Sequence, residues 1–477
     1  MSVSSLPFLH GALAAVLPKL AAWRRDFHAH PEAGWTEFRT AALIIRRLRE
    51  LGYAIRMGEA ACASDRRMGV PSSAVLAAAR ERALEHGADA ELVAGMGDGY
   101  TGFWADLDCG PGPVTAFRFD MDCNEVAECA EESHRPVREG FASRWPGLMH
   151  ACGHDGHASV GLGLAEVLVS IRRHLRGRIR LIFQPAEEGA RGALPMSEAG
   201  AVDGVDVLFG FHIGFKAEGP GSLICGTQGF LATTKRDVLF SGVPAHAGAA
   251  PEEGKDALLA ACSAVVNLHA ISRNGKGGTR IAVGRLEGGE ARNVIPASAR
   301  LFMETRGETT ELDAYMTAES ERILRASADL WGCACEWRTV GNSAGGGSSP
   351  ELARLIATVA EAMGGWKTVI PMSGFGATED FACLMSRVQA SGGLASYLQV
   401  GTDRAAGHHS DRFDFDETCL GRALELLARL VVRMAGGGQE DTETETESDM
   451  EFLDEVVRRK GIHVQLWLEG EDGEGFG

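Results

Sequence analysis

The chain has 477 residues, of which 45% are hydrophobic, and a formal net charge of −18. Its length predicts two domains rather than one core, and its acidic balance argues against a nucleic-acid partner. The N-terminal residues lack a basic region before their apolar part, no apolar run reaches about 18 residues, and the 11 cysteines follow no framework spacing. We therefore expect no secretion signal, reduced thiols, a cytoplasmic location and no membrane span.

Helical and strand patterns alternate through the first half of the chain. Helices are predicted at residues 18–27, 40–51, 73–85 and 157–173, and strands at residues 114–119, 178–183 and 205–211. This alternation predicts an α/β fold with a mostly parallel mixed sheet flanked by helices. Ligands of such sheets gather at the carboxyl ends of the strands, where this sequence places Asp120, Asp122, residues 184–188 and His212.

From residue 233 the pattern changes to that of a smaller α+β domain. Its strands are predicted at residues 236–241, 279–285 and 299–305, and its helices at residues 255–271 and 313–326. The Gly/Ser-rich run at 341–350 is predicted to be a return linker, and helices are expected at 351–363 and 421–434. We therefore expect a domain of residues 233–345 inserted into a catalytic domain formed by residues 1–232 and 346–436.

The last 41 residues differ sharply in composition from the rest. Residues 437–477 hold 13 acidic and 3 basic side chains, many of them in a low-complexity stretch. Such a segment buries too little apolar surface to offset its conformational entropy, so we expect a disordered acidic tail.

The motif HACGHDGH at residues 150–157 is the strongest local signal for chemistry. It places four potential metal ligands, His150, Cys152, His154 and His157, within eight residues. Thiolate and imidazole together bind transition metals. The same crowding makes metal ligation a better account than a chance His-rich loop, or than a nucleophilic role for Cys152.

Three further groups of ligand type follow along the chain. Glu187 and Glu188 come directly after a predicted strand, where adjacent carboxylates are unfavourable unless a cation or a proton separates them. One ligand and one general base is the natural division. His212 follows the next strand, and His408 and His409 lie in a late loop; spacing alone does not decide which of these two histidines is a ligand.

Taken together, the motifs resemble a known enzyme family. HACGHDGH, FQPAEEG, FHIG, GVPAHAGAAPEEGKDAL and GGEARNVIPASARL occur in the order found in the di-metal amidohydrolase/carboxypeptidase family, which includes aminoacylases and auxin-conjugate hydrolases. The resemblance covers about residues 10–434. It implies a zinc-peptidase-like catalytic domain, with the inserted domain serving as lid and dimerisation unit.

The resemblance also implies two divalent metal ions per chain. Cys152 would bridge them, His154 and His212 would complete one site, and Glu188 and His409 would complete the other. A bridging thiolate favours zinc because both are soft, whereas the relatives imply manganese, so both metals stay open.

Further roles are carried over from the family in the same way. Glu187 would be the general base, and Asp122 would orient a ligand from behind. In the inserted domain, His246 would stabilise the oxyanion in the site of a partner chain, while Asn293 and Arg306 would hold the substrate carboxylate.

The implied activity is hydrolysis of the amide bond of an N-acyl amino acid, with an aminobenzoyl-glutamate-type conjugate as the expected substrate. The alternatives are a broad N-acyl-amino-acid hydrolase and a non-catalytic scaffolding subunit. The expected assembly is a homodimer or a hetero-oligomer with a related second subunit.

Overall fold

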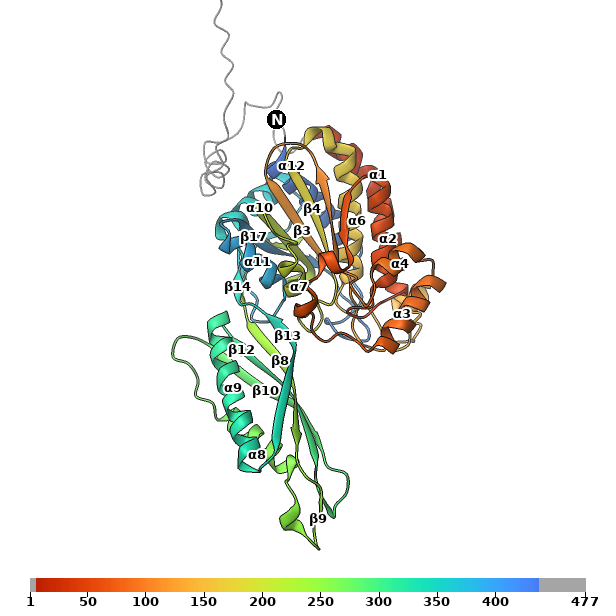
Figure 1. The fold of residues 1–477 in the computed structure, drawn as a ribbon. Coiled ribbons are helices and arrows are strands. Elements are labelled where there is room, and N and C mark those ends of the chain that lie inside the picture. Colours follow the sequence, from red (N-terminus) through yellow and green to blue (C-terminus); the bar gives the residue numbers. More distant parts are fainter. Residues whose placement is uncertain (1–5, 437–477) are drawn as a thin grey trace, which may run out of the picture.

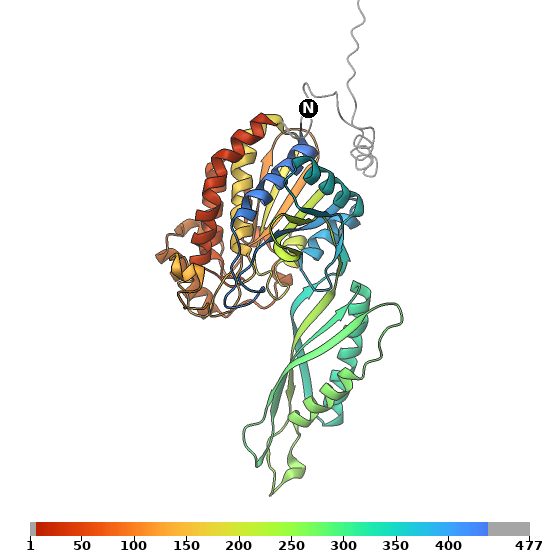
Figure 2. The same cartoon turned by 180° about the vertical axis from the view of Figure 1, so that it is seen from behind.

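The computed structural model describes residues 6–436 (Figure 1). A large α/β unit forms one end of the molecule, and a narrower unit extends from it through the long strands β8 (Ala232–Ser241) and β13 (Ala334–Ser343) (Figures 1 and 2). We call the narrower unit, residues 232–343, the lid unit, after the role that the family resemblance implies for it. The predicted acidic tail at 437–477 lies outside the described residues.

The large unit is built on a mixed eight-stranded sheet. In spatial order its strands are β1 (Ala54–Met57), β2 (Phe103–Asp108), β4 (Arg178–Gln184), β3 (Val114–Asp120), β5 (Val207–Glu218), β17 (Leu394–Thr402), β6 (Ser222–Ile224) and β15 (Thr368–Ile370). The central strands β4, β3, β5 and β17 run parallel, while β1, β2 and β6 pair antiparallel with their neighbours β2, β4 and β17. This confirms the predicted fold class.

Helices cover both faces of this sheet (Figures 1 and 2). The helices of the large unit are α1 (Pro7–Ala29), α2 (Phe38–Glu50), α3 (Ser73–Glu85), α4 (Ala90–Gly95), α5 (Arg135–Arg138), α6 (His154–Ile171), α7 (Ala193–Glu198), α10 (Pro350–Met363), α11 (Phe381–Ala390) and α12 (Thr418–Ala435); α3 and α4 pack on α2 rather than on the sheet. Ala116 packs in the core beneath α7 and α11, and its neighbour Phe117 packs in the core beneath α1, α6 and α12. Successive side chains of a strand point to opposite faces, so β3 contributes to both cores.

The first helix is longer than predicted. It begins at Pro7 rather than at Pro18, which lies inside it. An interior proline costs about 3 kcal/mol. The buried stripe of Leu9, Leu13 and Leu20 recurs at helical spacing and offsets that cost, because it packs against α6 and α12.

Two other element boundaries differ from the prediction, and each places a candidate metal ligand inside a helix or a strand. Helix α6 begins at His154 and not at His157, so His154 occupies its first turn. Strand β5 runs through His212 to Glu218, beyond its predicted end at residue 211.

The lid unit has a four-stranded antiparallel sheet in the order β10 (Thr279–Gly288), β12 (Ser298–Gly307), β8 and β13. Helices α8 (Ala257–His269) and α9 (Thr310–Leu330) pack on one face of it, and the other face is left uncovered by helices (Figure 1). The two-residue strands β9 (Ala245–His246) and β11 (Val294–Ile295) pair at the end farthest from the large unit.

The Gly/Ser-rich run at 341–350 is not simply a linker, and in this respect the prediction is wrong. Residues 341–343 finish β13, and β14 (Gly346–Gly347) joins β7 (Thr227–Phe230) and β16 (Ser373–Gly374) in a three-stranded sheet. A Cβ atom at Gly341 would lie 2.2 Å from the carbonyl oxygen of Gly189. The glycine is therefore needed for the close approach of β13 to the loop after β4.

Within residues 6–436, no helix is both long enough and apolar enough to cross a bilayer. All 11 cysteines of the chain are free thiols in the structure.

Candidate metal centre

The polar residues after the central strands meet at one edge of the large sheet, as the parallel topology requires. Asp122 follows β3, Glu187 and Glu188 follow β4, and His212 lies within β5. The loop before α6 and the loop before α12 bring further ligand types to the same edge.

Two groups of three potential ligands lie side by side there. The first consists of Cys152, His154 and His212, and the second of Cys152, Glu188 and His409, with the ligand atoms of each group within 4.8 Å of one another. The Sγ atom of Cys152 lies 3.4 Å from Nε2 of His212, and Nε2 of His409 lies 3.2 Å from Oε1 of Glu188. Cys152 belongs to both groups, so its sulfur stands where two ions could share it.

The hydrogen bonds of the histidines fit a metal site. Nδ1 of His154 lies 2.8 Å from the carbonyl oxygen of Asp122, while its Nε2 is buried without a hydrogen-bond partner among the described residues. Nδ1 of His212 lies 2.8 Å from the carbonyl oxygen of Ile213, which leaves Nε2 facing Cys152. Metal-binding histidines usually donate their second ring N–H to a carbonyl or carboxylate in this way.

The donor set points to divalent transition metals. Burial raises the pKa of the Cys152 thiol well above its usual value, and the charge of Glu188 adds to this rise. A nearby cation is therefore needed to favour the thiolate. One thiolate, three imidazoles and one carboxylate suit zinc and its first-row neighbours better than calcium or magnesium.

Two of the four candidates in the HACGHDGH motif have other surroundings. His157 uses both ring nitrogens, because Nδ1 lies 2.6 Å from a carboxylate oxygen of Asp120 and Nε2 accepts the backbone N–H of Ile213 at 3.0 Å. It therefore fixes the backbone beside His212. His150 is buried, has no hydrogen-bond partner among the described residues, and lies outside every potential ligand group found there.

Asp122 contacts the site through both its carboxylate and its backbone carbonyl group. Its carboxylate accepts the backbone N–H groups of Glu187 and Glu188, both at 3.0 Å, and its carbonyl oxygen faces Nδ1 of His154. One residue thus holds the turn that carries the paired glutamates and the ring of a candidate ligand.

The two glutamates have different environments. Burial raises the pKa of Glu187 well above its usual value, and the charge of Glu379 adds to the rise. Burial also acts against the ionised form of Glu188, but the hydrogen bond with His409 and the charges of His154 and His409 together outweigh it and lower this pKa to about 2. Glu187 is therefore the better proton acceptor of the pair, and its Oε2 lies 4.0 Å from Nε2 of His154.

A neighbouring acidic pair was not predicted from the sequence. Carboxylates of Glu379 and Asp380 lie within 4.8 Å of that of Glu187. Arg118 donates to Glu379 at 2.9 Å, and Gln184 donates to Asp380 at 2.8 Å. The signal available in the sequence was the adjacency of the two acids, the same feature that identified Glu187 and Glu188.

Between the paired histidines of the late loop, only His409 faces the ligand groups. The ring of His408 lies 2.8 Å from Arg404 and 3.1 Å from the carbonyl oxygen of Ile213, and it stacks on Phe215. His409 has a φ of 65°, an uncommon value for a residue with a side chain, and its N–H donates to the carbonyl of Ala151 at 2.8 Å. This contact ties the loop to the backbone just before Cys152.

The predicted lid residues separate into two places. His246 is exposed on β9 at the far end of the lid unit, where the carbonyl oxygen of Asn293 accepts the backbone N–H of Ala247. Arg306 lies on β12 opposite Thr233, close to the point where β8 leaves the large unit. Within one chain, β9 at the tip of the lid unit therefore lies far from the large unit, which carries the candidate metal ligands (Figure 1).

Comparison with known proteins places the chain in a family. The model of Peptidase family M20/M25/M40 matches residues 116–433. The chain is 44% identical to the indole-3-acetyl-aspartic acid hydrolase of Enterobacter agglomerans, over 89% of this chain and 97% of that protein. It is 45% identical to the A subunit of the p-aminobenzoyl-glutamate hydrolase of Escherichia coli (strain K12), over 87% of this chain and 95% of that protein.

Solved structures agree. The aminobenzoyl-glutamate utilization protein from Klebsiella pneumoniae superposes with a TM-score of 0.77 at 39% identity, covering 89% of this chain and 98% of that one. The YXEP protein of Bacillus subtilis, described as a dinuclear metal binding peptidase from the M20 family, has a TM-score of 0.60 at 25% identity, over 88% and 98% of the two chains. The predicted resemblance is thereby confirmed, and the chain belongs to Peptidase family M20/M25/M40 and is an enzyme that hydrolyses amide bonds.

Proposed function

We propose that this chain hydrolyses the amide bond of an N-acyl amino acid, most specifically that of p-aminobenzoyl-glutamate, a folate breakdown product, to give p-aminobenzoate and glutamate. The observation that carries the proposal is the pair of ligand groups that share Cys152. Beside them lies Glu187, a carboxyl group whose pKa is raised. Two similar proteins support the substrate class, because both names specify the conjugate of an acidic amino acid.

Two divalent ions, manganese or zinc, would be held by the two groups. Cys152 would bridge them, with His154 and His212 on one side and Glu188 and His409 on the other. When bound, such a pair polarises a carbonyl group and lowers the pKa of water, which is the chemistry an amide hydrolase needs.

Glu187 would then transfer a proton from the attacking water to the leaving nitrogen. Glu187 takes a proton from the water whose oxygen attacks the amide carbon, and passes it to the amide nitrogen as the C–N bond breaks. The products are a carboxylic acid and the free amino group of the amino acid. Asp122 keeps Glu187 and Glu188 in place through their backbone N–H groups.

The lid unit would complete the site across a dimer interface. His246 is exposed at the lid tip, so it is free to enter the site of a partner chain, where it would stabilise the oxyanion, with Asn293 close by. Arg306 would hold the substrate carboxylate, since a guanidinium binds carboxylates through two parallel hydrogen bonds.

The partner would be a second copy of this chain or a related second subunit. The Escherichia coli relative is named as one subunit of its enzyme, which supports the second arrangement. A broad N-acyl-amino-acid hydrolase is the alternative. The chain is also 30% identical to the N-acyl-L-amino acid amidohydrolase of Geobacillus stearothermophilus, over 66% of this chain and 74% of that protein.

A turnover panel on purified protein tests the proposal. It compares p-aminobenzoyl-glutamate with indole-3-acetyl-aspartate and with acetyl- and benzoyl-conjugates of neutral amino acids, in the presence of manganese or zinc. Faster turnover of the glutamate conjugate is expected. Equal turnover of neutral conjugates would favour the broad hydrolase, and no turnover by protein that retains its metals would contradict the proposal.

A further inference from the structure

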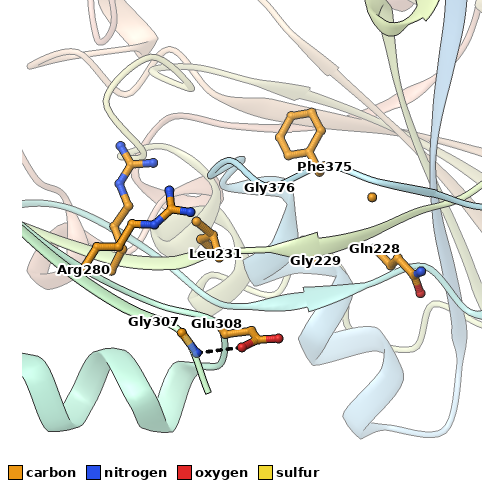
Figure 3. Close-up of a pocket in the computed structure, with 11 residues that line it drawn as sticks. Gln228, Gly229, Leu231, Arg280, Gly307, Glu308, Phe375 and Gly376 are labelled. Carbon is orange, nitrogen blue, oxygen red and sulfur yellow. Dashed lines mark hydrogen bonds between the residues drawn. The ribbon is translucent and has the colours of Figure 1, made fainter. Parts of the chain in front are cut away.

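A pocket of about 570 Å³ lies where the lid unit joins the large unit (Figure 3). Arg280, Glu308 and Gly307 line it from the lid side, and Gln228, Gly229, Phe375 and Gly376 line it from the side of the large unit. Arg306 also lines this pocket. Two guanidinium groups therefore face one cavity at the junction.

The two arginines are direct neighbours on adjacent strands. Arg280 on β10 pairs with Arg306 on β12 in the antiparallel register. Residues directly opposite in such a pair point to the same face, with Cβ atoms about 4.5–5.5 Å apart, and like charges there are destabilising. Ile281 and Thr305, the chain neighbours of the two arginines, are buried on the side of the sheet that the helices cover. The arginines therefore lie on the face that α8 and α9 leave open.

Most N–H donors of these two guanidinium groups form no hydrogen bond within the described residues. Glu304 binds only Nε of Arg306, at 2.8 Å, and the terminal nitrogens of that guanidinium have no hydrogen bond among residues 6–436. Arg280 has no ion pair within the same residues. Glu308 also lines the pocket, where Oε2 of its carboxylate accepts the backbone N–H of Gly278 at 2.8 Å rather than an arginine N–H. A ligand with two carboxylates could accept hydrogen bonds from these donors.

The pocket lies next to the candidate metal centre. The ring of Phe375, in its wall, is 5.3 Å from that of Phe215, which in turn is 4.3 Å from the ring of His212. At the same level of the lid sheet, Gly341 approaches the carbonyl of Gly189, the residue directly after Glu188. A substrate whose amide lies at the candidate metal ligands could extend one of its two ends to this junction, and the two arginines favour the end that carries carboxylates.

We infer that Arg280 and Arg306 together form a clamp for the two carboxylates of a dicarboxylic amino acid, and that Arg280 selects the carboxylate of its side chain. This inference rests on the proposed function and deepens it. Leu231 and Phe375 offer apolar contacts for the methylene groups between the two carboxylates. Each guanidinium presents a fork of donors that matches a carboxylate, and a neutral amide cannot replace that match.

A comparison of two conjugates tests the clamp: p-aminobenzoyl-glutamate, and p-aminobenzoyl-glutamine, in which the side-chain carboxylate is a neutral amide. Arg280→Ala should lower kcat/KM for the glutamate conjugate by about 10- to 100-fold, the worth of hydrogen bonds to a charged group. For the glutamine conjugate the change should be smaller than about threefold, since this substrate forms no such bonds. Arg280→Lys should restore part of the preference, because it keeps the charge but not the fork.

Arg300→Ala is the matched control. Arg300 lies on the same strand and the same open face as Arg306, but lines a separate pocket with Phe302 and Trp337. It should leave both substrates unchanged. Equal losses on both substrates with Arg280→Ala, or an equal loss of preference with Arg300→Ala, would overturn the clamp. Metal content and thermal unfolding should match the wild type in all three variants.

Failure of the proposed function is recognised separately. If the metal-loaded wild type hydrolyses neither conjugate, calorimetric titration with N-acetyl-glutamate and N-acetyl-glutamine tests the clamp by binding alone. Tighter binding of the glutamate ligand, abolished by Arg280→Ala, would support the clamp without hydrolysis. Equal binding of the two ligands by the wild type would refute it.

Discussion

Cys152 and His212 bring their side chains to 3.4 Å although 60 positions separate them in the chain. The contact joins the loop before α6 to strand β5, and it places the thiol between a pair of histidines and a Glu–His pair. The sulfur is the one ligand atom common to both groups among the residues that the structure describes. Changes at this position should therefore affect both groups, whereas a change at any other ligand should affect one.

The first prediction concerns metal content. Wild-type protein should hold two divalent ions per chain, Cys152→Ala should lose both, and His409→Ala should lose one, because only the sulfur belongs to both groups. Elemental analysis of purified protein measures this. Cys123→Ala, at a buried cysteine outside the ligand groups, is the control and should keep both ions. Two ions retained by Cys152→Ala would contradict the bridge.

A second prediction separates the two glutamates. Glu187→Gln should keep both ions and a near-normal KM, while kcat falls by about 10²- to 10⁴-fold, the usual worth of a positioned general base. Glu188→Gln should instead lower the metal content, because Glu188 lies 3.2 Å from His409 in a ligand group. Kinetics and metal analysis on both variants decide the roles, and the opposite pattern would reverse them.

The lid can be tested by complementation between protomers. His246 lies on β9 at the exposed tip of the lid unit, far from the candidate metal ligands of its own chain (Figure 1). Mixing inactive His246→Ala with inactive Glu187→Gln should restore activity, because a hybrid dimer contains one site with both residues intact. Exchange of protomers is followed with fluorescent labels. Exchange without recovered activity would show that His246 does not act across the interface.

Asp122 should matter without binding metal or substrate directly. Asp122→Asn replaces one of two acceptor oxygens by an N–H donor that faces a backbone N–H. Metal affinity or kcat should fall by about 10- to 100-fold, the usual effect of losing a supporting partner. Competition with a chelator measures the affinity. Asp89→Asn, at the helix cap of α4, keeps an equivalent cap and should have no effect.

Arg24 should be important for stability rather than for chemistry. It is fully buried and donates to Asp155 and Asp414, both at 2.9 Å, and to Glu417. Arg24→Leu leaves these carboxylates without their buried partner and should lower the free energy of unfolding by about 3–5 kcal/mol. Chemical denaturation measures the loss, and Arg46→Leu, an exposed change on α2, should stay within about 0.5 kcal/mol of the wild type.

The same network predicts how this loss depends on pH. Burial opposes the ionised forms of Asp414 and Glu417, but hydrogen bonds from Arg135 and Arg25 and the charge of Arg24 outweigh it and lower both pKa values. Acids with lowered pKa values stabilise the fold above their unfolded pKa of about 4, and this stabilisation disappears as the pH falls through the folded values. The difference between wild type and Arg24→Leu should therefore be smaller at pH 3 than at pH 7, and an equal difference at both would contradict this account.

The sequence by itself determined features that depend on neighbouring residues. The helix at Ser73–Glu85 has the predicted bounds, because Ser72 caps it and its apolar spacing is local. The HACGHDGH motif at 150–157 and the adjacent carboxylates at 187 and 188 are likewise contiguous, so they could be identified as candidate site residues from the sequence alone. Strand–helix alternation then predicted which sheet edge would collect them.

Only the tertiary structure decided relationships across long stretches of chain. Strand β17, which was not predicted, lies between β5 and β6. Its position determines where the following loop with His408 and His409 lies, and of these two histidines only His409 belongs to a ligand group with Cys152. The pairing of Arg280 with Arg306 depends on strand register, and a shift of one residue would send one of the two side chains to the opposite face. Such contacts are set by packing of the whole sheet, and no local pattern of residues encodes them.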